Sequence, residues 1–192
     1  MQKPSDADDS HLALGRAHLN QFILEARKSV PLDSGQILEI GSQGRSEVQE
    51  AFSGFEVKSF DIVDDFNPDY VGDITRHNHE IPDESFDAIA CLEILEHTLQ
   101  PFDAIVELRR MLKDGGYLLI SAPLNFRIHG PVPDCWRFTE FGWRILLKDF
   151  DILRLDQLET PGRPLFPIKY NILARCNKDK AVDARSLQFE RI

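Results

Sequence analysis

One short stretch limits the fold of this chain more than any other. It reads Gln36-Ile37-Leu38-Glu39-Ile40-Gly41-Ser42-Gln43-Gly44-Arg45. An apolar run that ends in an acid and breaks at a glycine is typical of a buried strand that enters a tight turn before a helix. Because Gly41 has no Cβ, the backbone N–H groups of such a turn can approach a ligand closely. The stretch therefore predicts a ligand-binding turn at the end of the first strand.

Length and charge narrow the class of protein. The 192 residues, of which 42% are hydrophobic, suit one domain with one sizeable core. The formal charge of −10 repels a phosphate backbone, so we expect no nucleic-acid partner. Small molecules, sugars and cationic ligands remain open as substrates.

The sequence contains no motif for membrane insertion, secretion or a cysteine-based site. No stretch approaches the ~20 apolar residues of a membrane helix, so we expect no membrane partner. The first nine residues lack the apolar core of a secretory signal, which favours a cytoplasmic protein. Cys91, Cys135 and Cys176 form neither a disulfide framework nor a CxxC zinc motif, so we expect packed, reduced thiols.

Apolar runs alternate with helical patterns along the chain, which predicts an α/β fold with a doubly wound, mostly parallel sheet. The seven expected strands are 36–40, 56–60, 69–71, 86–92, 117–122, 150–155 and 170–175. The expected helices are 10–29, 45–52, about 100–113 and 139–147. Residues 1–9 are expected to be a disordered leader, 10–176 a single domain, 160–167 a proline-rich linker and 177–192 a charged tail.

The first helix has two interpretations. Ser10 is a suitable N-cap, and an apolar stripe follows it at loosely helical spacing. The favoured interpretation is a packing helix at the edge of the core, and the alternative is a helix that closes over the ligand pocket.

Two ligand classes are commonly held by a turn of this kind, nicotinamide dinucleotides and S-adenosylmethionine. The dinucleotide pattern G-x-G-x-x-G fails, because Gln43 lies between Gly41 and Gly44. Asp61 lies at the end of the second expected strand, where an acid can accept both ribose hydroxyls of any adenosine ligand. The turn and this acid alone do not separate the two classes.

The motifs that follow do separate them. They are Val71-Gly72-Asp73-Ile74, then Phe86 to His97 leading into Gln100-Pro101, then Leu108 to Ile120, and finally Pro131-Val132-Pro133-Asp134-Cys135-Trp136-Arg137-Phe138-Thr139. Over roughly residues 36–175 this ordered set resembles the class I S-adenosylmethionine-dependent methyltransferases, and it looks closest to the small type 11/12 methyltransferases. The resemblance implies a Rossmann-like, seven-stranded, mostly parallel sheet with an antiparallel C-terminal strand, an enzyme, and S-adenosyl-L-methionine as its cofactor.

The resemblance also implies roles for matching positions. Glu39 and the turn of Gly41, Ser42 and Gln43 would border the methionine part of the cofactor. Asp61, with Ile62 beside it, would take the ribose hydroxyls, and Asp73 with the Ile74 backbone would hold the adenine edge. Cys91, Leu92 and Glu93 would lie beside the sulfonium.

Each role has a structural alternative. Asp61 and Asp73 are also common turn formers at strand ends, and Glu39 could orient the backbone amides of the turn. The family pattern E-x-G-x-G-x-G is altered here, because Gln43 and Arg45 replace two glycines. Gln43 could instead offer its amide to the methionine carboxylate.

The candidate general bases for transfer to an oxygen or nitrogen are His129 first, then His97, Asp134 and Glu93. Residues 125–130 follow the fifth strand, where an acceptor would lie, and histidine titrates near neutral pH. The alternative for His129 is a loop histidine that bonds the backbone.

The aromatic segment that follows also has two interpretations. Trp136 and Arg137, with Asp134, could form an acceptor wall. Alternatively, Trp136 and Phe138 anchor the segment to the core, while Arg137 pairs with Glu93 or Glu96.

We expect no metal site from the sequence. His77 and His79 are two residues apart in a polar loop and have no third ligand at a suitable spacing. Glu93 and Glu96 only weakly resemble the acid cluster of a magnesium-dependent catechol site.

The sequence thus favours methyl transfer to a small-molecule acceptor, such as a hydroxyl or amine of a sugar or natural product. The alternatives are a methyltransferase that acts on a macromolecule and a non-enzymatic binding module with the same fold. A nicotinamide-dependent oxidoreductase is disfavoured by the missing glycine pattern. The sequence does not determine the oligomeric state.

Overall fold

Seven strands form one sheet in the order β3-β2-β1-β4-β5-β7-β6 in the computed structural model, which describes residues 4–189. The first five strands of this order are parallel, and β7 is antiparallel to both of its neighbours, β5 and β6. The strands are β1 (Gly35–Ile40), β2 (Phe55–Asp61), β3 (Tyr70–Val71), β4 (Phe86–Leu92), β5 (Leu112–Pro123), β6 (Phe150–Thr160) and β7 (Arg163–Cys176). The predicted doubly wound, mostly parallel sheet is confirmed.

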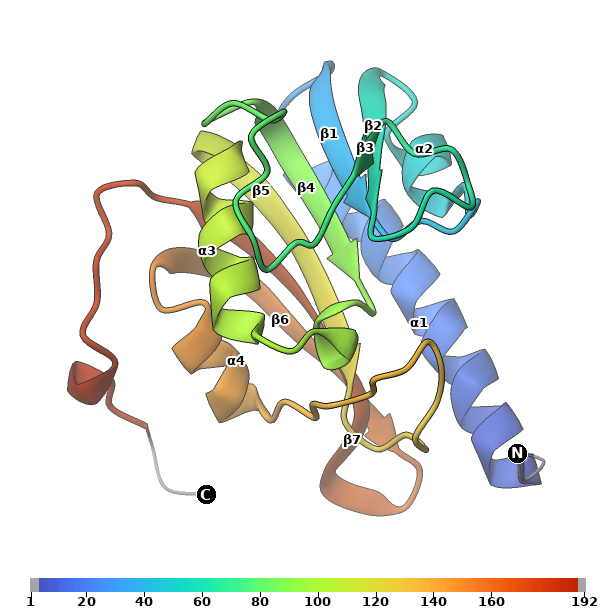
Figure 1. Cartoon of the computed structure of the whole chain (residues 1–192). Coiled ribbons are helices and arrows are strands. Elements are labelled where there is room, and N and C mark those ends of the chain that lie inside the picture. The colour runs from blue at the N-terminus through green and yellow to red at the C-terminus, as the bar shows by residue number, and fades with distance from the viewer. Residues whose placement is uncertain (1–3, 190–192) are drawn as a thin grey trace.

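Helices cover both faces of the sheet (Figure 1). On one face lie α1 (Asp6–Ser29) and α2 (Glu47–Ala51), and on the other lie α3 (Pro101–Met111) and α4 (Glu140–Leu146). Two short 3₁₀ turns complete the order, η1 (Leu95–His97) and η2 (Ala184–Ser186). The sheet therefore separates two apolar cores.

Strand β1 shows how one strand serves both cores. Successive side chains of a strand point to opposite faces. Ile37 packs on the side of α1 and α2, whereas Leu38 and Ile40 pack on the side of α3 and α4. This alternation places Glu39 on the same face as Ile37. Its side chain is therefore directed toward α1.

The first helix starts earlier than the sequence suggested. Ser5 caps it: Ser5 Oγ accepts from the Asp8 amide at 3.2 Å, and Asp8 Oδ2 accepts from the Ser5 amide at 2.8 Å. This reciprocal pair is a capping box, and the acids of the first turn favour the positive end of the helix. The prediction of a disordered leader over 1–9 with a cap at Ser10 is therefore wrong for residues 6–9. Residues 1–3 lie outside the described residues.

Contacts with β7 hold α1 against the sheet. The Asn171 amide lies 2.8 Å from His18 Nδ1, and Gly15 packs next to the Lys169 side chain. The N-terminal half of the 24-residue helix α1 extends past the carboxyl end of β4 (Figure 1). The alternative interpretation, a helix over the pocket, agrees with this position.

The expected linker 160–167 is a hairpin instead. Strands β6 and β7 pair up to Thr160 and Arg163, and Gly162 supplies the positive φ of 73° that the turn needs. Proline is tolerated in β7 here because residues before Ile168 pair only with β6, not with β5. The proline-rich composition therefore marked a strand end rather than a linker.

The start of the charged tail is bound to the domain. The Arg109 guanidinium donates to the carbonyl groups of Asn177, Lys178 and Lys180 at 2.8, 2.9 and 3.1 Å. Residues 190–192 lie outside the described part of the chain. Within residues 4–189, no helix has the length and apolarity that crossing a membrane requires.

The capping box gives a test of the helix start. Ser5→Ala removes the N-cap acceptor, which contributes about 1 kcal/mol, so amide hydrogen exchange in the first turn of α1 should become several-fold faster. Ser10→Ala is the matched control, because Ser10 is an exposed residue inside the helix. Faster exchange in Ser10→Ala and not in Ser5→Ala would contradict a helix that begins at Asp6.

Candidate functional site

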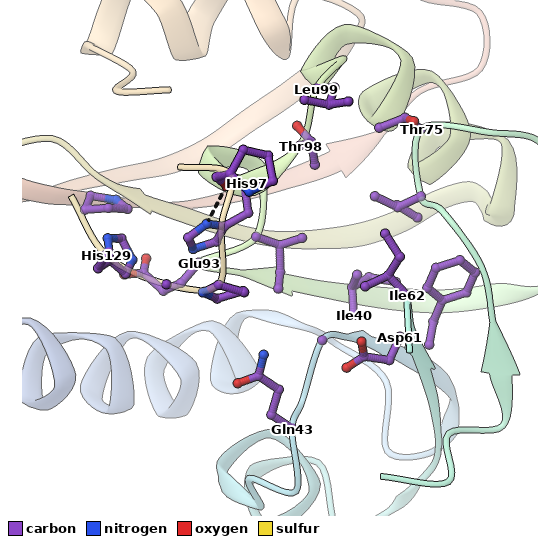
Figure 2. A pocket seen from close by; sticks show the side chains of 18 of the residues that line it. Ile40, Gln43, Asp61, Ile62, Thr75, Glu93, His97, Thr98, Leu99 and His129 are labelled. Carbon is purple, nitrogen blue, oxygen red and sulfur yellow. Dashed lines mark hydrogen bonds between the residues drawn. The ribbon is translucent and has the colours of Figure 1, made fainter. Parts of the chain in front are cut away.

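A cleft of about 830 Å³ opens at the carboxyl ends of β1, β2 and β4. The neighbours β1 and β4 are where the strand order reverses, the place at which open α/β sheets bind ligands. Nine predicted site residues line the cleft: Gly41, Gln43, Asp61, Ile62, Asp73, Ile74, Glu93, His97 and His129. Asp61 and Ile62 lie at one end of the cleft, Glu93, His97 and His129 lie at the other, and Gln43 lies between them (Figure 2).

Helix α1 supplies a wall that the site prediction left out. His11, Leu12, Gly15 and Arg16 line the cleft. The sequence signal for this position was only an amphipathic stripe, which does not say what covers the stripe. The contacts of α1 with β7 place the helix beside the cleft.

The turn after β1 requires glycine at its first position. Gly41 has a φ of 66°, and a Cβ there would collide with Ile94 Cδ1. Its amide donates to the Phe60 carbonyl at 2.8 Å, which joins the turn to β2. Arg45, which replaces a family glycine, donates from Nε to the Ser42 carbonyl at 3.1 Å. The Arg45 amide donates to the same carbonyl at 3.0 Å, so the backbone and the side chain of Arg45 together close the altered turn.

The two acids after β2 and β3 both reach the cleft. Asp61 is 8% exposed, and its Oδ1 accepts from the Val63 amide at 3.3 Å. Asp73 Oδ1 accepts from both the amide and the hydroxyl of Thr75, at 2.9 and 2.7 Å. Asp73 is thus a turn former that also lines the cleft, and the two interpretations of this residue are compatible.

Five predicted site residues do not line the cleft: Glu39, Ser42, Cys91, Leu92 and Asp134. Cys91 and Leu92 are buried in the two apolar cores because the end of β4 is covered on both faces. Their side chains therefore do not reach the cleft, and a place beside the sulfonium stays a prediction for the backbone of these two residues. Ser42 is half-buried in the turn, where its carbonyl accepts from Arg45.

Glu39 lies beneath the turn, in a small hollow with Leu19, Asn20 and Val48. Burial raises the pKa of its carboxyl group from 4.5 to about 7, against the opposing effect of Arg45 and with a further rise from Glu47. Glu39 therefore does not line the large cleft, and its place beside the methionine part of the cofactor stays a prediction. Its position fits the alternative role of supporting the turn from below.

Glu93 is fixed by several partners. Its backbone adopts a φ of 60°, and its amide donates to the Ser121 carbonyl at 3.1 Å. Its Oε1 accepts from Ser121 Oγ at 2.7 Å and pairs with Lys169 Nζ at 3.0 Å. These contacts fix the position of the Glu93 carboxylate at the edge of the cleft.

The two cleft histidines lie against each other, with ring centroids 4.9 Å apart and an interplanar angle of 73°. His97 Nδ1 lies 3.1 Å from the Pro133 carbonyl oxygen. His129 Nδ1 lies 3.2 Å from the Arg127 carbonyl oxygen and 3.1 Å from Asp134 Oδ2. All three partners are acceptors, so Nδ1 carries the proton of each neutral ring and Nε2 carries a lone pair.

Asp134 is not a free base. Its side chain is fully buried, and Arg137 donates to Oδ1 and Oδ2 at 2.5 and 2.8 Å. Although burial alone would raise the pKa of Asp134, the Arg137 guanidinium and the His129 amide lower it to about 2. The prediction of Asp134 as a general base is wrong, since so acidic a group scarcely accepts a proton at neutral pH. Its partner is Arg137, which does not pair with Glu93 or Glu96 as proposed from the sequence.

The aromatic segment after Asp134 is structural. The Trp136 indole donates to the Thr98 carbonyl at 2.9 Å, and its ring stacks on Phe138 with centroids 6.2 Å apart. Phe138 in turn packs on the fully buried Trp143 at 5.0 Å. Neither Trp136 nor Arg137 is among the described residues that line the cleft. The predicted acceptor wall is therefore not formed by these two side chains.

Glu96 was missed as a site residue. Its side chain has no exposed surface, and among the described residues no group donates to either carboxyl oxygen. Burial and the neighbouring Glu93 raise its pKa well above the ordinary value of 4.5. One ligand atom each from Glu96, His97 and His129 lie within 4.8 Å of one another. The sequence signal was an acid and a histidine in succession, a pattern that also fits a solvated cap.

A family model described as a methyltransferase domain matches residues 44–120. The matched region runs from the turn after β1 into β5 and includes the segments that supply Asp61, Asp73 and Glu93. No curated protein matches this chain in sequence.

Solved structures share the fold at low sequence identity. The [4+2]-cyclase SpnF is 16% identical with a TM-score of 0.64, over 82% of this chain and 80% of its own. An S-adenosylmethionine-dependent methyltransferase from Methanosarcina mazei is 20% identical with a TM-score of 0.58, over 78% and 96%. The Burkholderia thailandensis 1,6-didemethyltoxoflavin-N1-methyltransferase, solved with its acceptor and S-adenosylhomocysteine, is 14% identical with a TM-score of 0.60, over 93% and 94%. At these identities the likeness shows the fold alone.

The burial of Glu39 gives a pH-dependent prediction. Its folded pKa is raised, so the folded state holds a proton that the unfolded state has lost, and stability falls as pH rises from 4.5 to about 7. Glu39→Gln has no ionisable carboxyl group at this position, so the variant should not lose stability in this pH range. The variant should match the parent below pH 4.5 and exceed its free energy of unfolding by at most about 3 kcal/mol above pH 7, in urea titrations. An equal difference at every pH would show that Glu39 titrates normally.

Proposed function

We propose that this chain, a class I S-adenosylmethionine-dependent methyltransferase by its fold and its matched domain, methylates a hydroxyl or amine of a small molecule such as a sugar or natural product. S-adenosyl-L-methionine is the cofactor. The observation that carries the proposal is the cleft itself, with Asp61 at one end, the glycine turn between, and two histidines at the other end.

The first end suits the cofactor. Asp61 has one oxygen engaged with Val63 and its second available to a ribose hydroxyl, at the end of β2 beside the turn. Asp73 and Ile74 lie further along the same edge and would hold the adenine. The exposed Gln43, two residues after Gly41 in the same turn, would reach the methionine carboxylate. The sulfonium would then lie toward Glu93.

The second end suits an acceptor. Methyl transfer is an in-line displacement at carbon, and the sulfonium already provides the leaving group. The protein therefore contributes positioning and, for a protonated acceptor, a base worth ~10²–10⁴-fold. His129 lines the cleft, its ring is oriented by Asp134, and its Nε2 carries a lone pair. Burial lowers the pKa of His97, which favours the neutral form of this second ring.

Size and charge favour a small acceptor over a macromolecule. A cleft of about 830 Å³ falls in the range of small-molecule sites. Helix α1 and the segment from Phe126 to Pro133 both contribute to its walls, which narrows the entrance for a large partner. The formal charge of −10 opposes a nucleic acid. The acceptor named for the Burkholderia enzyme is likewise a small molecule. We also propose that the protein is located in the cytoplasm, where S-adenosylmethionine is available.

The strand-end acid provides the test of cofactor binding. Asp61→Ala should weaken the binding of S-adenosylhomocysteine more than about tenfold, because a hydrogen bond to a charged group contributes roughly 1.5–3 kcal/mol. Isothermal titration calorimetry measures the affinity. Asp64→Ala is the matched control, since Asp64 is an exposed acid on the loop after β2 and does not line the cleft.

The outcomes separate the proposals. Equal affinities in the parent, Asp61→Ala and Asp64→Ala would mean that Asp61 does not bind the ribose. No heat with either S-adenosylmethionine or S-adenosylhomocysteine in the folded protein would favour a module without cofactor affinity. Cofactor turnover with oligonucleotides or peptides, and none with hydroxylated or aminated small molecules, would favour a macromolecular acceptor.

A further inference from the structure

The acceptor end of the cleft contains a three-residue cluster that the methyl-transfer proposal leaves partly unused. Glu96 and His97 come from η1, and His129 comes from the segment that follows β5. Each offers one ligand atom, and these atoms lie within 4.8 Å of one another. Glu96 Oε1 and His97 Nε2 are 3.9 Å apart, too far for a hydrogen bond. Such spacing leaves room for an atom between them.

Both histidines are prepared to act as ligands. A metal ion binds the lone pair of a neutral imidazole, and the other ring nitrogen then donates to an acceptor. Here the Nδ1 atoms are the donors, to the Pro133 carbonyl from His97 and to Asp134 and the Arg127 carbonyl from His129. The Nε2 atoms are therefore the lone-pair positions. His97 is 13% and His129 is 25% exposed, and both line the cleft.

Glu96 is the independent observation that indicates a cation. Its carboxyl group is completely buried, and among residues 4–189 no protein group donates to either of its oxygens. A buried polar group without a partner costs about 1–3 kcal/mol, and more when it is charged. The nearby cations are already paired, Lys169 with Glu93 and Arg137 with Asp134. A positive ion beside Glu96 would compensate for this burial.

We propose that Glu96 and the Nε2 atoms of His97 and His129 bind a divalent transition-metal ion of the Zn²⁺ type at the acceptor end of the cleft. Two imidazoles and one carboxylate are a common ligand set for such ions, whereas Mg²⁺ prefers oxygen ligands. Both histidines line the cleft and Glu96 is fully buried, so open coordination positions of the ion would face the cleft.

The surroundings resemble the outer support of a metal centre. The Asp134 carboxylate holds His129 Nδ1 and is itself held by both Nη atoms of Arg137. The backbone carbonyl of Glu96 accepts from the Cys135 and Trp136 amides at 2.7 and 3.2 Å, which fixes η1 against this segment. Carboxylate–histidine pairs of this kind set the ring orientation and strengthen the ligand. They also explain why a buried Asp–Arg pair lies beside the cleft.

The sequence predicted no metal because the ligands come from two distant segments. Thirty-one residues separate His97 from His129, and no spacing rule connects them. The adjacent pair Glu96-His97 alone is too common to indicate a metal. Only the fold of the segment after β5 back over η1 brings the third ligand into place.

The role of the ion rests on the proposed function. An acceptor hydroxyl bound at an open position would have a lowered pKa and would release its proton to water. Its oxygen would then form a bond to the methyl carbon, while the carbon–sulfur bond breaks and its electron pair stays on sulfur as S-adenosylhomocysteine. A bound ion uses the lone pair of His129 Nε2, so this ring would then be a ligand instead of the general base.

Metal titration of the full chain, stripped with EDTA, tests the site. The parent should bind one Zn²⁺ by calorimetry, and Co²⁺ should produce visible d–d absorption that Zn²⁺ abolishes. His97→Ala and His129→Ala should each weaken Zn²⁺ binding at least about tenfold, and Asp134→Asn should do so by about 10–100-fold. Mg²⁺ should bind far more weakly than Zn²⁺.

His77→Ala is the matched control. His77 and His79 also lie together, with ring centroids 4.6 Å apart, and His77 Nδ1 lies 3.7 Å from Glu107. The two histidines belong to the loop before β4 and Glu107 belongs to α3, and none of the three lines the cleft. Its removal should leave the strong Zn²⁺ site and the Co²⁺ spectrum unchanged.

Circular dichroism without metal confirms that each variant folds. Glu96→Gln, which keeps the side-chain shape, adds a second test if the alanine variants are unstable. The proposal is overturned if the parent binds no Zn²⁺ or Co²⁺, if the cluster variants bind as the parent does, or if His77→Ala removes the site. S-adenosylhomocysteine titration in parallel keeps the two proposals separate. Cofactor binding without metal binding would reject the metal site and leave the methyltransferase proposal standing.

Discussion

The parallel pairing of β1 with β4 is the constraint on which the site depends. Its register places Ile40 opposite Cys91, so both strands end at the same edge and their chains leave it together. Gly41 and Glu93, just beyond these ends, both adopt positive φ, and Ile94 packs where a Cβ of Gly41 would lie. The two turns are thus fitted to each other. The cleft opens where they separate.

The acceptor side depends on buried charge rather than on apolar packing. Asp134 and Arg137 pair below the surface, and Glu93 and Lys169 form a second pair at 3.0 Å. Removing one partner of a buried pair leaves an uncompensated charge, so such pairs fix the geometry around them. Between the two pairs, Glu96 has no comparable partner. The Glu96 carboxyl group of η1 therefore lies close to both histidines without a hydrogen-bond partner of its own among the described residues.

Particular elements show how far sequence reasoning extended. The glycine at 41, the acids at 61 and 73 and the histidines at 97 and 129 follow strands in the sequence, and all of them line the cleft. Cys91 and Leu92, by contrast, are the last two residues of β4, and their side chains are buried because this strand is covered on both faces. Asp134 was expected to be a base because of its type and place. Its buried contact with Arg137 makes it an acid with a pKa of about 2.

The sequence by itself determined the alternation of strands and helices, and hence the doubly wound sheet and the edge at which ligands bind. These follow from local hydrophobic patterns and turn residues, which are encoded over a few positions. Tertiary structure alone decided that α1 walls the cleft, that 160–167 is a hairpin, and that Glu96 meets His97 and His129. Each of these depends on contacts between residues far apart in the chain, and the burial that sets their charge states exists only in the folded protein.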